Sequence, residues 1–392
     1  MTKSNKALVL VSASILLGAS VWFTGTAAAA VLKLRWHLTE VEASGLTIAV
    51  QAGFIAGTLL YAVLNVADLF RTRTVFFASA VGAALFNAGF ALLSNGLASA
   101  VVLRFLTGVM LAGVYPVAMK IVAQWFNERI GWRLGLLLGA MTFGTATPHF
   151  LLSIGAAPDW RALALIASGL CVAGGAIVRF VLTDGPYLRE TPRFEPLEAF
   201  RIFRHRPFRL QAVGYFGHMW ELYTFWSLLG SFLAADAGTR PPLAADRIPA
   251  VVFLTIALGV PSCILGGWIS RRTGEKAVAL ASLAVSGAFC ALSPLLFGLP
   301  AGVLVPLLLV WGFFVVSDSP QFSALATRTC PPEYTGTALT IQNGVGFAVT
   351  VVSIPFIAWV SKHVGWRWAF SFLTIGPLVG AWSLARLRIE RD

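Results

Sequence analysis

Two titratable side chains lie close together inside an apolar run in the second half of the chain. Glu221 is near the middle of this run, and His218 precedes it by one helical turn on the same face. A carboxylate in apolar surroundings is costly to keep charged, so it can bind and release a proton, and a nearby histidine can tune or share that proton. We therefore expect Glu221 and His218 to carry a proton or to bind a polar ligand.

Three further ionisable residues lie within apolar runs. Arg104 should face a partner or a water-filled cavity, because a guanidinium is costly inside a membrane. We expect it to attract an anion or to respond to a proton, and a structural ion pair is the alternative. Asp318 lies two residues before Pro320, which leaves backbone groups free and favours a lined cavity. His149 is a candidate because histidine titrates near neutral pH.

Other polar and aromatic residues sit nearer the middle of the apolar runs than their ends. Each polar one is as well suited to a hydrogen bond between helices as to a cavity wall, and each aromatic one could instead face lipid. The candidates for lining a cavity are Trp22, Gln51, Tyr115, Trp220, Tyr223, Gln321, Gln342 and Asn343.

The composition is that of a membrane protein. Hydrophobic residues make up 57% of the 392 residues and charged residues 12%, about half the share of roughly 25% in soluble domains. The net charge of +12 does not indicate nucleic acid, because the basic residues lie between apolar runs. The four cysteines are scattered and form no CxxC pair, and no ATP-binding loop is present, so we expect no metal and no cofactor.

The apolar runs predict twelve transmembrane helices, since about 20 apolar residues cross a bilayer. The first run is too long for the apolar part of a signal peptide, so we interpret it as an uncleaved span. The predicted spans are 7–32, 43–67, 74–94, 98–124, 134–156, 161–183, 210–235, 248–270, 277–297, 301–327, 335–361 and 367–386.

A basic segment divides the chain. Residues 184–209 contain six arginines, and most of the 29 Lys and Arg residues fall on the same side of the membrane as this segment. This bias predicts that both termini are cytoplasmic. It also predicts a six-helix bundle over 1–183, a cytoplasmic connector over 184–209 and a second six-helix bundle over 210–392.

The two halves share features that indicate an internal duplication. Trp160-Arg161 opens the sixth span and Trp366-Arg367 opens the twelfth. Short basic loops follow the second and eighth spans: the first holds Asp68, Arg71 and Arg73, and the second holds Gly267, Arg272 and Gly274. A carboxylate at a helix end with arginines one turn on could hold a neighbouring helix end and so act as a gate; ordinary cytoplasmic anchoring is the alternative.

These loops and Arg104-Phe105-Leu106-Thr107-Gly108 resemble motifs of the major facilitator superfamily, over essentially the whole chain. The match departs from the family pattern at Leu64, where the family has glycine. The resemblance implies an all-α membrane fold of two pseudo-symmetric six-helix bundles, N-in and C-in, that acts as a monomer in the bacterial inner membrane. It also implies secondary transport by alternating access.

From this we expect a transporter of a small polar or anionic organic solute, coupled to protons, with sodium as the other possible ion. Parts of the seventh, tenth and eleventh spans resemble carriers grouped near nitrate/nitrite or cyanate transporters. The arginines of nitrate carriers are absent from the second and eighth spans, so nitrate is not carried over. Export of toxic or amphipathic compounds is the alternative function, and a membrane-embedded enzyme or a non-transporting receptor are more remote ones.

Overall fold

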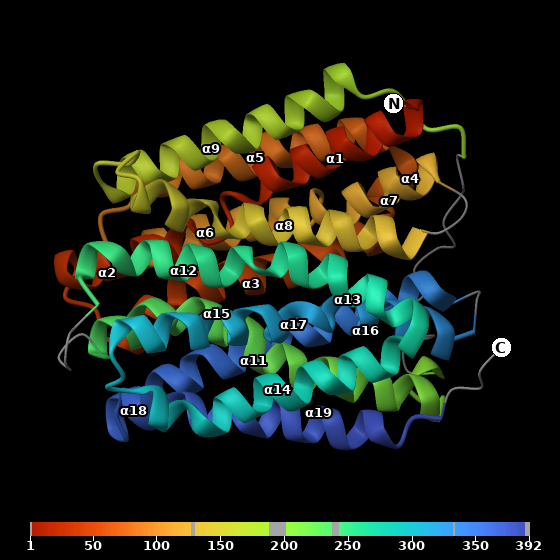
Figure 1. Ribbon diagram of the computed structural model, residues 1–392. Helices are drawn as coiled ribbons and strands as arrows, with labels where there is room; N and C mark the ends of the chain where they lie inside the picture. The colour runs from red at the N-terminus through yellow and green to blue at the C-terminus, as the bar shows by residue number, and fades with distance from the viewer. Residues whose placement is uncertain (1, 127–129, 188–200, 237–242, 332–333, 389–392) are drawn as a thin grey trace. The chain divides into compact units, whose positions relative to one another are not determined.

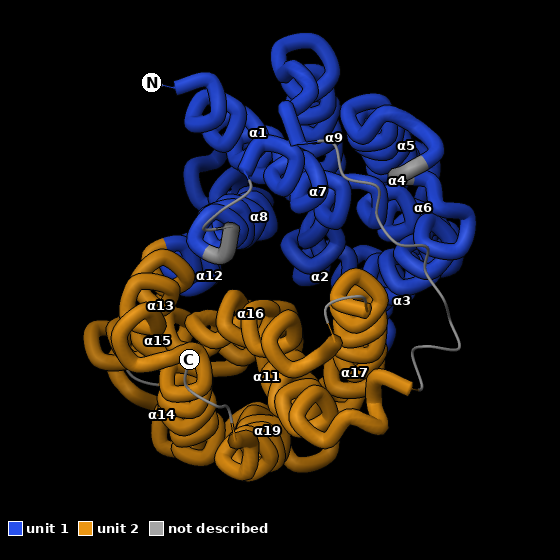
Figure 2. Tube along the Cα trace, turned by 90° about the vertical axis from the view of Figure 1, so that its right-hand side faces the viewer, with its two compact units in different colours: residues 1–190, 244–260 blue, residues 191–243, 261–392 orange. Residues whose placement is uncertain are grey.

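The computed structural model describes residues 2–126, 130–187, 201–236, 243–331 and 334–388, and every regular element in these ranges is a helix (Figure 1). The chain forms two compact units (Figure 2). The first unit contains residues 1–190 and 244–260, and the second contains residues 191–243 and 261–392.

The described residues of the first unit form ten α-helices, one π-helical turn and one 3-10 turn. Their bounds are α1 Lys3–Ala19, α2 Thr24–Arg35, α3 Glu40–Val63, α4 Val66–Leu69, α5 Thr72–Leu93, α6 Leu97–Leu111, α7 Tyr115–Trp125, α8 Ile130–Ser153, α9 Trp160–Ala176, the π-helix η1 Ile177–Val181 and, later in the chain, α12 Ile248–Ala257, which follows the 3-10 turn η2 Ala245–Arg247.

Every regular element among the described residues of the second unit is also a helix. Its elements are α11 Arg206–Asp236, α13 Gly259–Thr273 (whose first two residues are grouped with the first unit), α14 Glu275–Leu296, α15 Ala301–Ser317, α16 Ser319–Thr329, α17 Thr335–His363, α18 Trp366–Ala369, the 3-10 turn η4 Phe370–Thr374 and α19 Ile375–Ala385.

Eleven helical stretches of the described chain are long and apolar enough to cross a membrane. They coincide within a few residues with eleven of the twelve predicted spans, which confirms a multi-pass membrane protein. The remaining prediction, 210–235, falls on α11, a single helix of 31 residues. It is not among the eleven, because Glu221, His218 and the polar rings around them make it less apolar. The count of twelve spans and the cytoplasmic placement of both termini stay predictions.

Four of the predicted spans are broken near their middle. The first breaks between Ala19 and Thr24, the fourth between Leu111 and Tyr115, the eighth at Leu258 and the tenth at Asp318. A proline follows closely in three of these cases (Pro116, Pro261, Pro320), and its missing N–H explains the break. The break in the first span has no proline. Each break leaves backbone carbonyls free within the bilayer, and these need donors from other groups.

Glycines allow the helices of each unit to approach closely. In the first unit, a Cβ on Gly53 would lie 1.9 Å from the Phe105 carbonyl oxygen, and one on Gly108 would lie 2.1 Å from that of Val50, so α3 and α6 touch backbone to backbone. In the second unit, a Cβ on Gly217 would lie 2.2 Å from the Gly376 oxygen, which brings α11 against the segment that opens α19. Small residues at helix interfaces are the usual means of packing in lipid.

The boundary between the compact units differs from the predicted domain boundary in one segment. Residues 244–260 pack with the first unit, through contacts of α12 with α8 that include the Phe143–Phe253 and Phe150–Phe253 ring pairs. The predicted eighth span therefore divides between the units at its own break.

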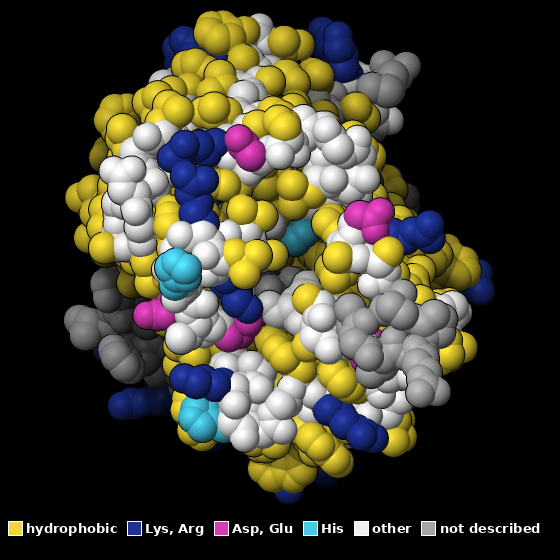
Figure 3. All heavy atoms as spheres, turned by 90° about the vertical axis from the view of Figure 1, so that its left-hand side faces the viewer, with side chains coloured by type: hydrophobic (Ala, Val, Ile, Leu, Met, Phe, Trp, Pro, Cys, Tyr) yellow, Lys and Arg dark blue, Asp and Glu magenta, His cyan; other side chains and the backbone are white. Residues whose placement is uncertain are grey.

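Charged side chains gather at the ends of helices. Figure 3 looks onto one such end, where Lys, Arg and His side chains lie among apolar ones and a few acidic groups. At this kind of position Lys33, in the last turn of α2, pairs with Glu40, in the first turn of α3.

Candidate functional site

Arg104 lies in the interior of the first unit, on α6, and is fully buried. Its Nη1 donates to the carbonyl oxygen of Val21 at 2.9 Å and to Oδ1 of Asn87 at 2.6 Å, and its Nη2 donates to the carbonyl oxygen of Trp22. Both carbonyls belong to the break in the first span. The break thus supplies acceptors that a continuous helix would have used internally, and Arg104 takes them.

The described residues give this guanidinium no counter-charge. No carboxylate of the described residues is within ion-pair distance of Arg104, and the centroid of the Phe90 ring lies 5.6 Å from its Cζ. The candidate spans of the first unit carry acidic residues only at helix ends, namely Glu40, Glu42 and Asp246. The described residues therefore contain no ion pair of Arg104, which was the alternative to a role in attracting an anion.

Three other predicted residues of the first unit are buried, and a fourth, Tyr115, is half-buried. Trp22 and Tyr115 both line a gap with about 160 Å³ of empty volume, but the gap is too narrow to admit a water molecule. Gln51 is fully buried, and neither of its amide atoms has a hydrogen-bond partner in the described residues. His149 is buried, with Nε2 likewise unpartnered there. Gln51 and His149 keep free capacity for a ligand, since buried polar groups normally find partners.

Glu221 lies in the interior of the second unit, on α11. Oε2 accepts from the Ser286 hydroxyl at 2.8 Å, and Oε1 accepts from Trp311 Nε1 at 2.8 Å and from the Cys290 thiol at 3.2 Å. The three donors come from α14 and α15, so the carboxylate ties α11 to both helices. All three are neutral, and Ser286 can turn its hydroxyl round to accept from a protonated Glu221.

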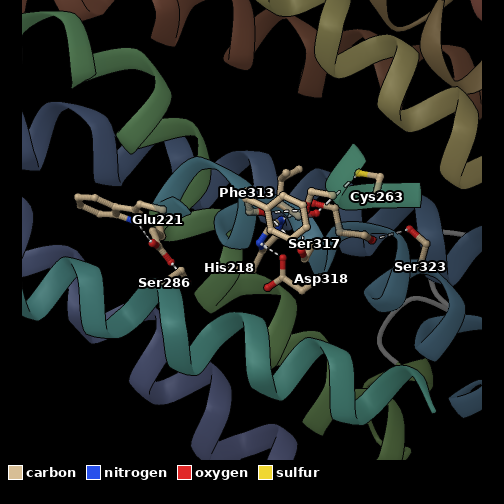
Figure 4. A network of polar contacts seen from close by, with 12 residues as sticks. His218, Glu221, Cys263, Ser286, Phe313, Ser317, Asp318 and Ser323 are labelled. Carbon is tan, nitrogen blue, oxygen red and sulfur yellow. Dashed lines mark hydrogen bonds and ion pairs between the residues drawn. The ribbon is translucent and has the colours of Figure 1, made fainter. Parts of the chain in front are cut away.

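His218 contacts Asp318 rather than Glu221. Figure 4 shows His218 directed at Asp318 while Glu221 meets Ser286. Nδ1 of His218 lies 2.9 Å from Oδ1 of Asp318, and Nε2 is 2.8 Å from the Ser319 hydroxyl. The Nδ1–Oδ1 pair is at ion-pair distance but not aligned for a hydrogen bond, since Oδ1 accepts none in the described residues.

The break in the tenth span places this pair. Asp318 ends α15 and Ser319 starts α16, so both groups that His218 touches lie at the break. From α13, the Ser262 hydroxyl donates to the Phe313 carbonyl oxygen and contacts the Ser317 hydroxyl at 2.6 Å. The Cys263 thiol, also on α13, donates at 3.8 Å to the Val316 carbonyl oxygen, which is the one that the missing N–H of Pro320 would have bonded in a continuous helix. The His218–Asp318 pair therefore lies directly at a discontinuity of the tenth span.

Three polar candidates remain in the second unit, namely Asn343, Gln342 and Gln321. The Tyr215 hydroxyl donates to Oδ1 of Asn343 at 3.0 Å, and Nε2 of Gln211 donates to Oε1 of Gln342 at 2.6 Å, so α11 and α17 are joined by polar contacts. Gln321 is buried, and its Nε2 has no partner in the described residues.

Two aromatic candidates on α11 pack against other rings. The Tyr223 ring lies 5.6 Å from that of Trp226 and 5.2 Å from that of Phe347. Trp220 is half-buried, and its ring lies 5.7 Å from that of Phe356.

The loop candidates of the first unit meet the end of the sixth span. Arg73 donates to both oxygens of Asp184, at 2.7 and 2.9 Å, and to the Leu182 carbonyl oxygen at 2.6 Å. This guanidinium holds the pKa of the Asp184 carboxyl below its usual value, mainly through the hydrogen bond. Arg71 is exposed. The side chain of Asp68 lies outside the described part of the structure.

The second unit repeats this arrangement with different residues. Lys276, in the first turn of α14, donates to the carbonyl oxygens of Ala385 at 3.0 Å and Leu387 at 2.6 Å, where α19 ends. In both units a basic residue at the start of a helix therefore holds the carbonyl end of the last span, which agrees with the predicted duplication.

The loop candidates of the second unit make fewer contacts. Arg272 lies over the Trp268 ring, 5.1 Å from its centroid. Gly267 has open space where a side chain would be, and Gly274 has φ of 84°, a left-handed value that suits the turn between α13 and α14.

Sequence reasoning missed the neutral partners of the charged groups. Asn87, Ser286, Cys290, Trp311 and Ser319 each contact one of the predicted ionisable residues. Of these five residues, Asn87 is the one that the sequence could have indicated, because it is an amide in the middle of the apolar run 74–94. The described residues contain no cluster of His, Cys, Asp and Glu that could hold a metal.

Comparison with known proteins identifies one family. The model of the Major Facilitator Superfamily matches residues 10–353. This stretch includes most of both compact units, and Arg104, Glu221 and Asp318 all lie within it.

Three curated proteins illustrate the similarity. The probable sulfoacetate transporter SauU of Cupriavidus necator is 27% identical over 321 residues, 74% of this chain and 72% of that protein. The niacin transporter NiaP of Acinetobacter baylyi is 25% identical over 317 residues, 71% of this chain and 68% of that protein. The probable galactarate/D-glucarate transporter GudP of Escherichia coli is 26% identical over 151 residues, 38% of this chain and only 33% of that protein.

Proposed function

Because the chain belongs to the major facilitator superfamily of membrane transporters, we propose that it is a secondary transporter of a small organic anion, driven by protons. The observation that carries the proposal is Arg104, a buried cation whose hydrogen-bond partners are all neutral. A charge kept in this way is costly, and a negatively charged solute would offset the cost when it binds.

The substrates in the names of the three relatives support the same class of solute. Sulfoacetate, niacin and galactarate are chemically diverse, but each carries a carboxylate. Since the carboxylate is what they have in common, we place this chain's substrate among small carboxylates without choosing one. The placement near nitrate or cyanate carriers stays a prediction.

The second unit supplies the groups for proton coupling. Two buried carboxylates, Glu221 and Asp318, lie within its spans, a third, Asp236, is the last residue of α11, and no Lys or Arg of its described residues is buried. In our proposal the Asp318–His218 pair and Glu221 bind the proton that accompanies the anion. A proton and a monovalent anion such as nicotinate moving together transfer no net charge, whereas a dianion such as sulfoacetate or D-glucarate would need two protons for an electroneutral cycle.

Uptake into proteoliposomes that contain a pH-sensitive dye tests the proposal. Nicotinate, sulfoacetate and D-glucarate would be supplied outside, each with its pH change recorded, beside the uncharged nicotinamide. The expected result is that at least one carboxylate enters with a proton and that nicotinamide does not.

Two arginine variants complete this test. Arg104→Gln should abolish carboxylate uptake, because it removes the buried charge. Arg35→Gln, which removes an exposed arginine at the end of α2, should leave uptake unchanged. Uptake of nicotinamide as fast as nicotinate, or full carboxylate uptake by Arg104→Gln, would refute the proposed function. A sodium gradient that replaces the proton gradient would refute the coupling alone.

A further inference from the structure

Asn87 contacts Arg104 in a way that only an uncharged amide can achieve. It lies on α5 and is fully buried. Its Oδ1 accepts from Arg104 Nη1 at 2.6 Å, while its Nδ2 donates to the Ala164 carbonyl oxygen at 2.8 Å and to the Ser168 hydroxyl at 3.0 Å. Arginine can only donate and a backbone carbonyl can only accept, so the amide has one possible orientation.

An aspartate would have the same shape but the wrong chemistry at this position. Its second oxygen would face the Ala164 carbonyl oxygen at the distance where Nδ2 now donates, so two acceptors would meet. Its charge would also neutralise Arg104. Asn87 thus gives the guanidinium a strong acceptor without cancelling its charge, and the hydrogen bonds from Asn87 to α9 hold that acceptor in place.

We propose that Asn87 determines the charge of the transported solute. It does so by positioning Arg104 through a neutral contact, which preserves the positive potential that selects an anion. This inference rests on the proposed function, since it assigns a second residue to the selection of the anion. The competing interpretation is that Asn87 only ties α5, α6 and α9 together.

The variant Asn87→Asp separates the two interpretations, because it keeps the shape and changes the charge. We expect the KM for nicotinate, sulfoacetate or D-glucarate to rise about tenfold, the effect of one unit charge acting over about 10 Å at an effective dielectric of about 20. The preference for nicotinate over nicotinamide should fall by a similar factor, and kcat should change little.

Two variants serve as controls. Asn87→Ser keeps a neutral acceptor and should retain the preference for the anion. Asn95→Asp makes the same chemical change on an exposed residue before α6 and should behave as the wild type. If Asn87→Asp does not reach the membrane, Ser168→Asp places the charge on the other side of the Asn87 amide, and we expect a smaller rise in KM.

The outcomes are distinct. A KM for Asn87→Asp equal to that of the wild type overturns the inference and leaves the proposed function intact. A loss confined to kcat, or an equal loss of anion preference in Asn87→Ser, shows a structural tie and also overturns it. If the wild type transports nicotinamide as fast as nicotinate, the proposed function itself is refuted, and the inference with it.

Discussion

Replacing Glu221 tests the role of the second unit most directly. Gln is nearly the same shape as Glu but cannot bind or release a proton. In Glu221→Gln the amide oxygen can still accept from Trp311 and Cys290, and the amide group can donate to Ser286, whose hydroxyl turns round. We expect the loss of stability to stay below about 1.5 kcal/mol, the net value of one hydrogen bond.

Glu221→Ala is the contrasting variant. It leaves the Trp311 indole without an acceptor, and an indole N–H can only donate a hydrogen bond. An orphaned buried donor costs roughly 1–3 kcal/mol, and the vacated volume adds to this, so we expect a loss of about 3 kcal/mol. Ser286 and Cys290 lose less, because both can donate to carbonyls of their own helix.

Two measurements on the same preparations give the result. Thermal unfolding in detergent should leave Glu221→Gln close to the wild type and lower the midpoint of Glu221→Ala. The pH change that accompanies carboxylate uptake in proteoliposomes should be lost in Glu221→Gln. If this stable variant moves protons with the solute as the wild type does, Glu221 is structural, and Asp318→Asn becomes the decisive variant.

Two further predictions concern the helix ends and the packing of the first unit. The Arg73–Asp184 contact should hold at neutral pH and weaken as the pH falls below about 4, because the pKa of Asp184 is lowered in the folded state. Proteolysis of the connector at a series of pH values would measure this weakening, and Asp184→Asn should remove the pH dependence. Gly53→Ala should destabilise the protein in thermal unfolding by several kcal/mol, because the new Cβ would lie 1.9 Å from the Phe105 carbonyl oxygen, roughly half a normal contact distance. Gly302→Ala, with open space around it, should not.

The sequence alone determined the class of the protein. Lipid is the only solvent that accepts so many apolar residues, and the length of a span follows from the bilayer thickness. Eleven spans were therefore predicted within a few residues. The loop motifs and the Arg104 stretch indicated the family that the comparison then showed. Charged residues inside apolar runs were identified as candidates because their cost makes them rare.

Tertiary structure decided how these charged residues are paired. Sequence spacing put His218 beside Glu221, but His218 turns to Asp318, because the break at Asp318 brings that carboxylate within 2.9 Å of the ring. The break between Ala19 and Thr24 contains no proline from which it could have been predicted, and yet it provides the carbonyl oxygens that accept hydrogen bonds from Arg104. Contacts between helices far apart in the chain depend on helix rotation and close glycine packing, and a periodic apolar pattern specifies neither.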